Sequence, residues 1–357
     1  MNKKLETLAA MLPDDTSAAL VAAPHNLCYL TGFPSGDSWL FITRGKSYFL
    51  TDFRYIEVAK NTIVGAECVM ITRLSQTLID LCHKEGVTRI FLEESETSLA
   101  QANLLRRAVS DVDFEMGDEL DSWLVGMRAV KDEHEVALIE QAQRITEAGF
   151  EHILPYIREG ATEREVALEL EFFMRREGAQ RVAFDFIVVS GANTSLPHGI
   201  PSDKPIEKGD FITMDFGAVI DGYHSDMTRT VALGFVSDEQ KHIYETVLKA
   251  QKNALSVLKA GVSCVDGDAA ARDIIKAAGY GESFGHGTGH GVGVQVHEAP
   301  NLSPRAGERL LKVGNVVTVE PGIYLEGRFG VRIEDMVLIT QDGCRNLTRS
   351  PKELIVL

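Results

Sequence analysis

Cysteine is scarce in this sequence, and the few cysteines form no pattern. There are five in 357 residues, and none belongs to a CxxC pair; they are Cys28, Cys68, Cys82, Cys264 and Cys344. Scattered cysteines in an odd number argue for free thiols in a reducing compartment rather than for a disulfide framework. We therefore expect a cytoplasmic protein.

Long apolar runs are missing as well. No stretch approaches the ~18 apolar residues that a membrane-spanning helix needs, so we expect no contact with a membrane interior. Lys3 and Lys4 are followed by Glu6 and by the pair Asp14-Asp15, which interrupt the apolar run of the N-terminus. A secretory signal requires such a run, and none is predicted.

Positive charge is also in short supply. Lysine and arginine total 36 against 52 aspartates and glutamates, which gives a formal net charge of −16. Such a chain would repel phosphate, so we expect no nucleic-acid partner. The acidic excess fits a site that binds cations through carboxylates, and it is equally consistent with a role in solubility alone.

The apolar content, by contrast, is ample for a sizeable core. Apolar residues make up 45% of the chain, and the length suggests roughly two domains. Residues 1–126 alternate predicted strands and helices, which indicates an α/β layer. The predicted elements are a strand-like run at 18–23, a hairpin made by Trp39–Thr43 and Ser47–Thr51, a helix over 74–85 and a strand over 89–93.

Nothing in this first third predicts a catalytic site. His25 and His83 are isolated, and Asp52 with Arg54 is interpreted as a structural ion pair.

A composition shift at residues 126–131 predicts a domain boundary near residue 127, which separates residues 1–126 from residues 127–357. Beyond the boundary, apolar residues at helical spacing predict a helix over 133–153. Thr162 and Glu165 match a capping box, which predicts a second helix that begins there. We interpret both helices as packing elements.

A strand over 211–219, the turn Asp221-Gly222 and a further strand predict a β-hairpin. Asp215 and Asp226 would lie near the same level of this hairpin, and a bulge would let both face one side. A lone carboxylate among apolar neighbours, as at Asp215, is costly unless it is paired or binds a metal. A buried salt bridge is the alternative explanation.

Residues 285–293 have a glycine at every odd position, with His286 and His290 among them. This spacing does not fit GxGxxG, so a dinucleotide site is excluded. Alternating glycines let the backbone pass close to a bulky group, such as a metal and a bound peptide. Either histidine offers a nitrogen to a metal, and spacing alone does not decide between them.

Two further carboxylates lie in β-prone sequence. Glu320 ends a run of β-branched residues, and Glu334 lies within another apolar run. With Asp215 and Asp226 they would form a cluster of four carboxylates, which repel one another strongly unless cations neutralise them. Oxygen ligands with one imidazole suit Mn²⁺, Co²⁺, Fe²⁺ or Zn²⁺, and a pair of such ions activates water and polarises a carbonyl. The residues therefore predict two divalent cations and a hydrolytic reaction.

Several motifs of this chain occur together in one known family. They are Leu196-Pro197-His198-Gly199, Met214-Asp215-Phe216-Gly217, Ser225-Asp226-Met227-Thr228-Arg229-Thr230, Gly289-His290-Gly291-Val292-Gly293, Val296-His297-Glu298, Thr318-Val319-Glu320-Pro321-Gly322 and Gly330-Val331-Arg332-Ile333-Glu334-Asp335. Over about residues 128–357 the chain resembles the pita-bread metallopeptidases, the family of prolidase, aminopeptidase P and methionine aminopeptidase. Residues 1–126 resemble the creatinase-type N-terminal domain of the prolidase branch through Asn26-x-x-Tyr29-x-x-Gly32 and Asp52-x-Arg54-Tyr55.

This resemblance implies an α/β (α+β) fold, with a C-terminal pita-bread catalytic domain and a smaller creatinase-type α/β N-terminal domain. It also implies two divalent ions per subunit, with Mn²⁺ or Co²⁺ preferred over Zn²⁺ or Fe²⁺, held by Asp215, Asp226, His290, Glu320 and Glu334. Asp226 and Glu334 would bridge both ions, and His286 would not be a ligand. Glu320 would also carry a proton between the attacking water and the leaving amine.

The resemblance further implies that His198 and His297 bind substrate and stabilise the tetrahedral intermediate. Arg332 would orient Asp226 or a neighbouring carboxylate. The implied reaction removes the N-terminal residue from a dipeptide or short peptide whose second residue is proline, and the implied assembly is a homodimer.

One position departs from the dipeptidase pattern. Dipeptidase members often have an arginine after the Val-His-Glu segment that binds the carboxylate of the substrate, whereas Asn301 lies there in this chain; Arg305 and Arg309 follow closely. A metal-free hydrolase of the creatinase type and a non-catalytic pita-bread binding protein are the alternative functions. The presence of all five ligand positions argues against both.

Overall fold

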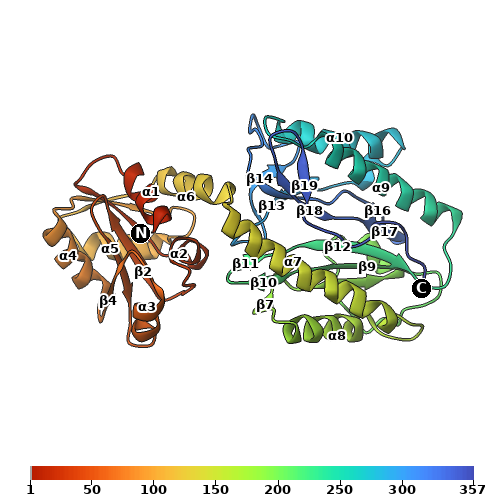
Figure 1. The fold of residues 1–357 in the computed structure, drawn as a ribbon, viewed down its shortest axis with the longest axis horizontal. Coiled ribbons are helices and arrows are strands. Elements are labelled where there is room, and N and C mark those ends of the chain that lie inside the picture. Colours follow the sequence, from red (N-terminus) through yellow and green to blue (C-terminus); the bar gives the residue numbers. More distant parts are fainter. Residues whose placement is uncertain (1) are drawn as a thin grey trace. The chain divides into compact units, whose positions relative to one another are not determined.

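The computed structural model describes residues 2–357. The chain divides into two compact units, Met1–Arg128 and Ala129–Leu357, and both combine helices with sheets (Figure 1). The mixed helix-and-sheet class predicted from the sequence is therefore confirmed. Among the described residues, no helix has both the length and the apolar composition to cross a membrane.

The first unit is built on a six-stranded sheet with the strand order β4-β3-β2-β1-β5-β6. β2 runs antiparallel to β1 and β3, and the other neighbours are parallel. The strands are β1 Ser17–Val21, β2 Trp39–Thr43, β3 Ser47–Thr51, β4 Glu67–Met70, β5 Arg89–Leu92 and β6 Asp113–Glu115. The helices are α1 Lys3–Met11, α2 Pro24–Thr31, α3 Ile56–Thr62, α4 Leu74–Glu85, α5 Leu99–Ala108 and α6 Glu119–Ala129.

An apolar layer joins this sheet to α4 and α5. Leu20 of β1, Leu78 of α4 and Leu105 of α5 belong to one buried cluster. The hairpin β2–β3 and the helix α4 have the bounds that the sequence predicts. Arg54 pairs with Asp52 at 2.6 Å, which confirms that these two residues form a structural ion pair.

The second unit contains the predicted site and several sheets. The sheet orders are β14-β13-β15-β18-β19, β12-β9-β8, β11-β10-β7 and β16-β17. Its helices are α7 Glu133–Ile153, α8 Glu163–Arg176, α9 Asp238–Val257 and α10 Cys264–Ala277, with short 3₁₀ turns η1 Leu154–Tyr156, η2 Gly191–Ser195 and η3 Gly281–Ser283. Its strands are β7 Arg181–Val182, β8 Ile187–Ser190, β9 Phe211–Phe216, β10 Ala218–Ile220, β11 Tyr223–His224, β12 Met227–Ala232, β13 Gly289–Gly291, β14 Glu298–Leu302, β15 Val316–Val319, β16 Gly322–Leu325, β17 Phe329–Arg332, β18 Asp335–Ile339 and β19 Cys344–Asn346.

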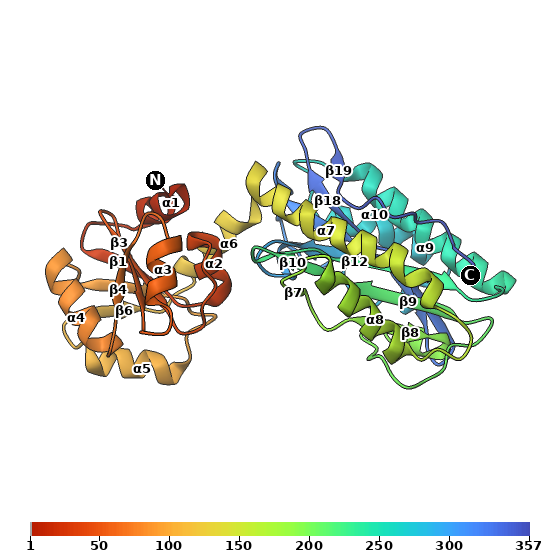
Figure 2. The same cartoon turned by 60° about the horizontal axis from the view of Figure 1, so that its bottom comes forward.

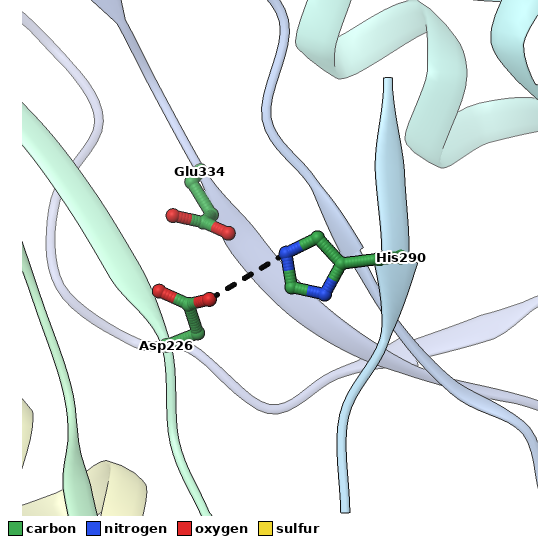
Figure 3. A group of neighbouring side chains, drawn as sticks. All are labelled: Asp226, His290 and Glu334. Atoms are coloured by element: carbon green, nitrogen blue, oxygen red, sulfur yellow. Dashed lines mark ion pairs between the residues drawn. The ribbon is translucent and has the colours of Figure 1, made fainter. Parts of the chain in front are cut away.

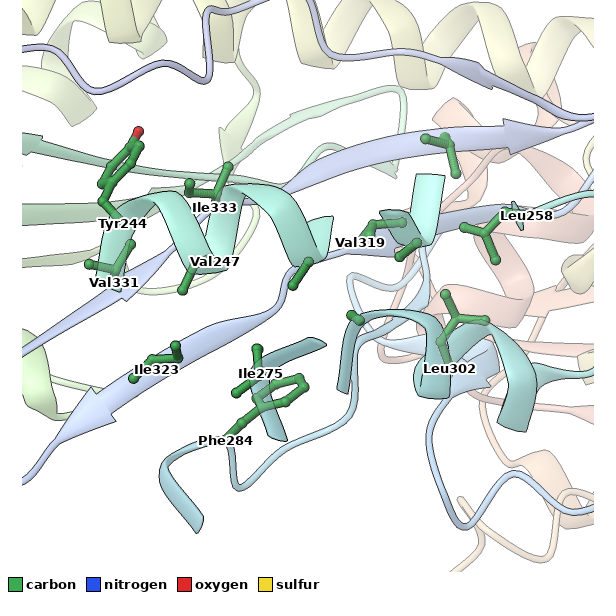
Figure 4. Packing of buried hydrophobic residues seen from close by; sticks show 14 of the residues in the cluster. Tyr244, Val247, Leu258, Ile275, Phe284, Leu302, Val319, Ile323, Val331 and Ile333 are labelled. Atoms are coloured by element: carbon green, nitrogen blue, oxygen red, sulfur yellow. The ribbon is translucent and has the colours of Figure 1, made fainter. Parts of the chain in front are cut away.

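Two pairs of helices cover the sheets of this unit (Figure 2). The pair α7 and α8 packs on β9, where Met214 and Phe216 join their apolar cluster. The pair α9 and α10 packs on β15 to β18, where Val319 and Val331 lie against Val247 of α9 (Figure 4). Because side chains alternate along a strand, Asp215 points away from the cluster that holds its two neighbours.

Capping boxes fix where α7 and α8 begin. At α8 the side chain of Thr162 accepts the backbone N–H of Glu165, and the Glu165 carboxylate accepts the N–H of Thr162. The capping box that the sequence predicts is therefore confirmed. Asp132 and Glu135 form an equivalent box at α7.

The predicted hairpin of residues 211–232 is present, but it is interrupted. Phe216 lies opposite Met227 and Val219 lies opposite His224, so the register is the same on both sides of the interruption. The bulge considered from the sequence is therefore not needed to bring the two aspartates to one side. Gly217 is required at the interruption, because a Cβ there would lie 1.9 Å from the carbonyl oxygen of Ser225.

Arg229 of β12 ties the C-terminal segment to the sheets. Its buried guanidinium donates to the carbonyl oxygens of Pro351 at 2.9 Å and Ser350 at 2.8 Å, and to the Asp335 carboxylate at 2.8 Å. It also donates to the carbonyl oxygen of Glu334. The backbone around Glu334 is therefore held by a residue of a different strand.

Candidate metal centre

All five predicted ligands line one pocket of about 820 Å³. They lie at or next to strand ends: Asp215 in β9, Asp226 directly before β12, His290 in β13, Glu320 directly after β15 and Glu334 between β17 and β18. Residues far apart in the sequence are thus brought together by strands of both helix-covered sheets. The structure gathers the set that the sequence predicted.

The tightest group is Asp226, His290 and Glu334, each of which offers one ligand atom within 4.8 Å of the others (Figure 3). His290 Nε2 lies 3.6 Å from Asp226 Oδ2 and 3.4 Å from Glu320 Oε1. Ligand bonds to metals such as zinc are about 2.0–2.2 Å long for nitrogen and oxygen. Side chains at these separations therefore need little movement to share an ion.

The cluster contains buried oxygens without donors. Asp215 Oδ1, Asp226 Oδ1 and Glu334 Oε1 accept no hydrogen bond within residues 2–357. Burial and the neighbouring carboxylates raise the pKa of Asp226 and of Glu334, and burial raises the pKa of Glu320 to about 8. Cations would satisfy these oxygens and remove the repulsion. The donor set therefore fits divalent metal ions.

The orientation of His290 points to the same conclusion. Its Nδ1 lies 3.1 Å from the carbonyl oxygen of Gly291, and burial lowers its pKa to about 3. A neutral ring that donates from Nδ1 presents the lone pair of Nε2 to the carboxylates of Asp226 and Glu320. Such a contact is repulsive without a cation, and it is the arrangement that metal-binding imidazoles adopt.

The glycines around His290 are needed for a reason that the sequence analysis did not identify. A Cβ at Gly289 would lie 2.0 Å from the carbonyl oxygen of Thr318, and one at Gly291 would lie 2.4 Å from that of Ala299. The close approach is therefore to the neighbouring strands β15 and β14. The sequence predicted a close approach to a bulky group; at these two positions the backbone of neighbouring strands accounts for it.

Arg332 contacts Asp215 rather than Asp226. Its Nη2 donates to Asp215 Oδ2 at 2.6 Å, and both side chains are nearly buried. Its Nε donates to the hydroxyl of Thr228 at 3.0 Å, and that hydroxyl donates to Glu334 Oε2 at 2.7 Å. One arginine thus orients one predicted ligand directly and a second through a hydroxyl.

Thr228 and Tyr324 are site residues that the sequence analysis missed. The Tyr324 hydroxyl lies 2.9 Å from Arg332 Nη1 and 2.9 Å from His286 Nε2. Both residues lie within or next to motifs already singled out, but nothing in their spacing showed which way their side chains point. His286 uses Nε2 on Tyr324 and places Nδ1 at 2.8 Å from the carbonyl oxygen of Gly287, so neither nitrogen faces the carboxylates.

The two other predicted histidines line the same pocket. His297 lies directly before β14, and its ring centroid is 4.3 Å from that of His290. Burial lowers the pKa of His297, so it is neutral near pH 7. His198 lies in the exposed segment that follows η2.

Asn301, Arg305 and Arg309, which follow the Val-His-Glu segment, differ in whether they reach the pocket. Asn301 and Arg305 line the pocket, whereas Arg309 is not among its lining residues. No carboxylate of residues 2–357 forms an ion pair with the Arg305 guanidinium. The pocket thus combines a cluster of carboxylates with one cation that has no acidic partner.

A unit of this architecture, with carboxylates and an imidazole that require divalent cations, is a metal-dependent hydrolase. Residues 137–341 match the model of metallopeptidase family M24, and residues 6–130 match that of the Creatinase/Prolidase N-terminal domain. The chain therefore belongs to metallopeptidase family M24 and is a peptidase.

Solved structures and a curated relative are similar to this chain over at least 96% of its length. A structure of an Xaa-Pro dipeptidase from Bacillus anthracis has a TM-score of 0.95 at 41% identity, with 99% of both chains covered. A structure of an X-Pro aminopeptidase from Thermotoga maritima has a TM-score of 0.90 at 40% identity, with 96% of this chain and 98% of that chain covered. A curated Xaa-Pro dipeptidase from Pyrococcus horikoshii is 37% identical over 358 residues, with 99% of both chains covered.

These similarities confirm the family and the two-part fold inferred from the motifs. They do not favour the metal-free hydrolase or the non-catalytic binding protein. The bound metal, the homodimer and the cytoplasmic location stay predictions.

Proposed function

We propose that this chain is a metal-dependent exopeptidase that hydrolyses the Xaa-Pro bond at the N-terminus of dipeptides and short peptides. The proposal rests on the convergence of four carboxylates and His290 in one pocket, with three buried oxygens left without donors. The relatives named Xaa-Pro dipeptidase and X-Pro aminopeptidase support the choice of bond.

Asp215, Asp226, His290, Glu320 and Glu334 would hold two divalent ions, with Mn²⁺ or Co²⁺ preferred. When bound, the ions supply an activated water and polarise the scissile carbonyl. The bond before proline has no N–H, so the protein groups must recognise this substrate without a hydrogen bond to the scissile nitrogen.

Side chains of this pocket have the properties that the remaining steps require. Neutral His297 and the nearby His198 would each donate a hydrogen bond to the carbonyl oxygen as it gains charge. Glu320 would deliver a proton from its carboxyl to the proline nitrogen as the bond breaks. Arg332 would keep Asp215 in one orientation throughout, because it contacts that carboxylate at 2.6 Å.

Arg305, unlike the other pocket arginine Arg332, forms no ion pair with a described carboxylate, and this suggests the length of the substrate. Arg305 has no acidic partner within the described residues, and a guanidinium binds a carboxylate through strong charge-assisted hydrogen bonds. We propose that Arg305 binds the C-terminal carboxylate of an Xaa-Pro dipeptide, with Asn301 beside it, in place of the arginine found in other dipeptidases. Arg309 would take no part, since it is not among the lining residues.

The test compares an Xaa-Pro dipeptide, its C-terminal amide, an Xaa-Pro tripeptide and an Xaa-Ala dipeptide with metal-reconstituted protein. We expect the Xaa-Pro dipeptide to be the best substrate. The Arg305→Ala variant should raise KM for the dipeptide by about 10- to 100-fold, with little change for the amide. Arg309→Ala is the matched control and should behave like the unmodified protein.

Two results would contradict these proposals separately. Faster cleavage of the Xaa-Ala dipeptide than of every Xaa-Pro substrate would exclude the assigned bond. Equal loss on dipeptide and amide in Arg305→Ala would exclude the carboxylate contact alone. Light scattering of the same protein would test the proposed homodimer.

A further inference from the structure

A single buried carboxylate lies at the base of the segment that contains His198. The segment covers residues 190–202, and its members Pro197 to Pro201 line the pocket. The carboxylate belongs to Glu163, the first residue of α8, which has 0% exposure. Glu163 is not among the lining residues, so it acts on the pocket only through this segment.

Glu163 accepts hydrogen bonds from both ends of the segment. Its Oε1 accepts from the backbone N–H of Ser190 at 2.6 Å, from the Ser190 hydroxyl at 3.0 Å and from the Asn193 side-chain amide at 3.0 Å. Its Oε2 accepts from the backbone N–H of Ser202 at 3.0 Å and from the Ser202 hydroxyl at 2.6 Å. One side chain therefore closes the loop by holding its two ends on separate oxygens.

The start of α8 reinforces this closure through its backbone. The N–H of Glu163 donates to the carbonyl oxygen of Lys204 at 3.2 Å, and the N–H of Arg164 donates to that of Ser202 at 3.0 Å. These N–H groups have no partner inside the helix. The C-terminal end of the segment is thus bound to the first turn of α8, and the capping box fixes where that helix begins.

The first half of the segment, η2, packs against β17, and two hydrogen bonds join the segment to β17. The hydroxyl of Thr194 accepts the N–H of Gly330 at 2.8 Å, and the carbonyl oxygen of Pro197 accepts Arg332 Nη1 at 3.2 Å. Ile200 at the tip is 85% exposed. His198 follows η2 and precedes the end held by Glu163, so its position depends on the packing of η2 and on how the two ends are held.

We infer that Glu163 is a positioning residue for this peptidase: by binding Ser190 and Ser202 on its two oxygens, it fixes the loop that presents His198 to the substrate. This inference rests on the proposed function, because it takes His198 to contact the substrate. A carboxylate is required since it offers only acceptors to five donors. A glutamine amide would turn its NH₂ group toward the backbone N–H of one end, whichever way it was oriented.

The test uses Glu163→Gln, which keeps the size of the side chain, with Glu165→Gln as the matched control on the same helical turn. Glu165 touches only its capping partner, and glutamine preserves a capping box. In metal-reconstituted protein, Glu163→Gln should lower kcat/KM for an Xaa-Pro dipeptide by about 10- to 100-fold. Glu165→Gln should remain within about twofold of the unmodified protein.

A double-mutant cycle separates positioning from general destabilisation. In a His198→Ala background, Glu163→Gln should cost less than about threefold, because the group it positions is gone. A loss of the same size in both backgrounds would contradict the inference. Bound metal measured in each variant should be unchanged, and a loss of metal in Glu163→Gln would equally overturn it.

Hydrogen exchange of the metal-free protein tests the contact without any substrate. Backbone amides of residues 190–202 should exchange faster in Glu163→Gln and at an unchanged rate in Glu165→Gln. Unchanged exchange in Glu163→Gln would overturn the inference even if activity fell. If the unmodified protein cleaved no Xaa-Pro peptide, the proposed function would fail, while the exchange result would still decide whether Glu163 holds the loop.

A milder variant keeps the test decisive if Glu163→Gln does not fold. Ser202→Ala removes only the hydroxyl donor at 2.6 Å. It should produce the same faster exchange in residues 190–202, to a smaller extent. No change in exchange for this variant, with Glu163→Gln unfolded, would leave Glu163 as a purely structural residue and reject its role in positioning.

Discussion

At the scale of the residue, Glu320 is predicted both to bind metal and to transfer a proton. It faces His290 Nε2 at 3.4 Å, and it has a carboxyl that the proposed mechanism uses to carry a proton. Two other carboxylates of the cluster accept from protein donors, Asp215 from Arg332 and Glu334 from Thr228. Glu320 is not held by an arginine as Asp215 is, so its carboxyl is available for the proton transfer that the proposed mechanism assigns to it.

The first prediction concerns this residue. Glu320→Gln should lower kcat by about 10²- to 10⁴-fold, because the N–H protons of an amide are too weakly acidic to be delivered to the leaving nitrogen. The fold should be kept, as measured by circular dichroism. Turnover close to that of the unmodified protein would contradict the role assigned to Glu320.

His25 in the first unit gives a prediction about pH. Burial, together with the charge of Arg128, lowers the pKa of His25 to about 4, below its ordinary value of about 6.5. Between these values the unfolded chain binds more protons than the folded one, so stability is complete above about pH 6.5 and falls as pH drops toward 4. Urea unfolding at pH 7.5 and pH 5 should show this loss, and His25→Gln should reduce it. His83→Gln, at an exposed position, should leave it unchanged.

At the scale of the element, the strand β13 depends on glycines that let it approach its neighbours. Gly289→Ala would place a methyl group 2.0 Å from the backbone oxygen of Thr318 in β15. We expect a loss of about 3 kcal/mol or more in the free energy of unfolding, since a backbone atom has little room to move. We also expect weaker metal binding, because β15 leads directly into Glu320.

The same segment offers a control for this prediction. A Cβ at Gly285 meets no atom within 4 Å, so Gly285→Ala should change stability by less than about 0.5 kcal/mol. Urea unfolding of both variants measures the difference. Equal stability of the two variants would show that β13 and β15 are not packed as closely as described.

Features that depend on neighbouring residues in the sequence were predictable, whereas features that depend on contacts between distant segments were not. The hairpin β2–β3, the helix α4 and the capping box of α8 depend on turn residues, spacing and short-range hydrogen bonds, all of which are visible in a short window. A glycine is needed at Gly289 because the backbone of β15, about thirty residues further along the chain, lies close to it. The hydrogen bonds of Glu163 likewise reach a loop about as distant in the sequence. Neither is visible in a local pattern.

The candidate site divides in the same way. Burial of like charges pointed to a metal, and the family motifs supplied the five ligand positions. The partner of Arg332 was predicted only as Asp226 or a neighbouring carboxylate, because the choice depends on which side chain its guanidinium reaches in space. Thr228 was overlooked for the same reason, since a hydroxyl within a strand has no local signature.

At the scale of the whole molecule, the predicted metal ligands all lie in the unit Ala129–Leu357. Both tryptophans, Trp39 and Trp123, lie in the other unit. Tryptophan fluorescence therefore reports on the first unit, and circular dichroism reports on both. This division allows the effect of metal on each unit to be followed in one sample.

We predict that Mn²⁺, added to metal-free protein, raises the unfolding midpoint of the second unit. Circular dichroism should show this shift, whereas tryptophan fluorescence, which follows the first unit, should not. At about 100 times the dissociation constant the gain is about 2.7 kcal/mol, or roughly 5–10 °C for a unit of this size. Asp226→Asn should abolish the shift and leave the metal-free variant at least as stable, because one buried like charge is removed. A shift of equal size in both transitions would contradict the confinement of metal to the second unit.

The order of the ligands along the chain has a consequence for biosynthesis. Glu334 is the last of the five ligands in the sequence. Arg229 donates hydrogen bonds to the carbonyl oxygen of Glu334 and to those of Ser350 and Pro351. A nascent polypeptide on the ribosome therefore lacks the complete set of five ligands until residue 334 has been synthesised and folded. A chain that ends before Glu334 should therefore bind the ions more weakly than one that contains all five ligands.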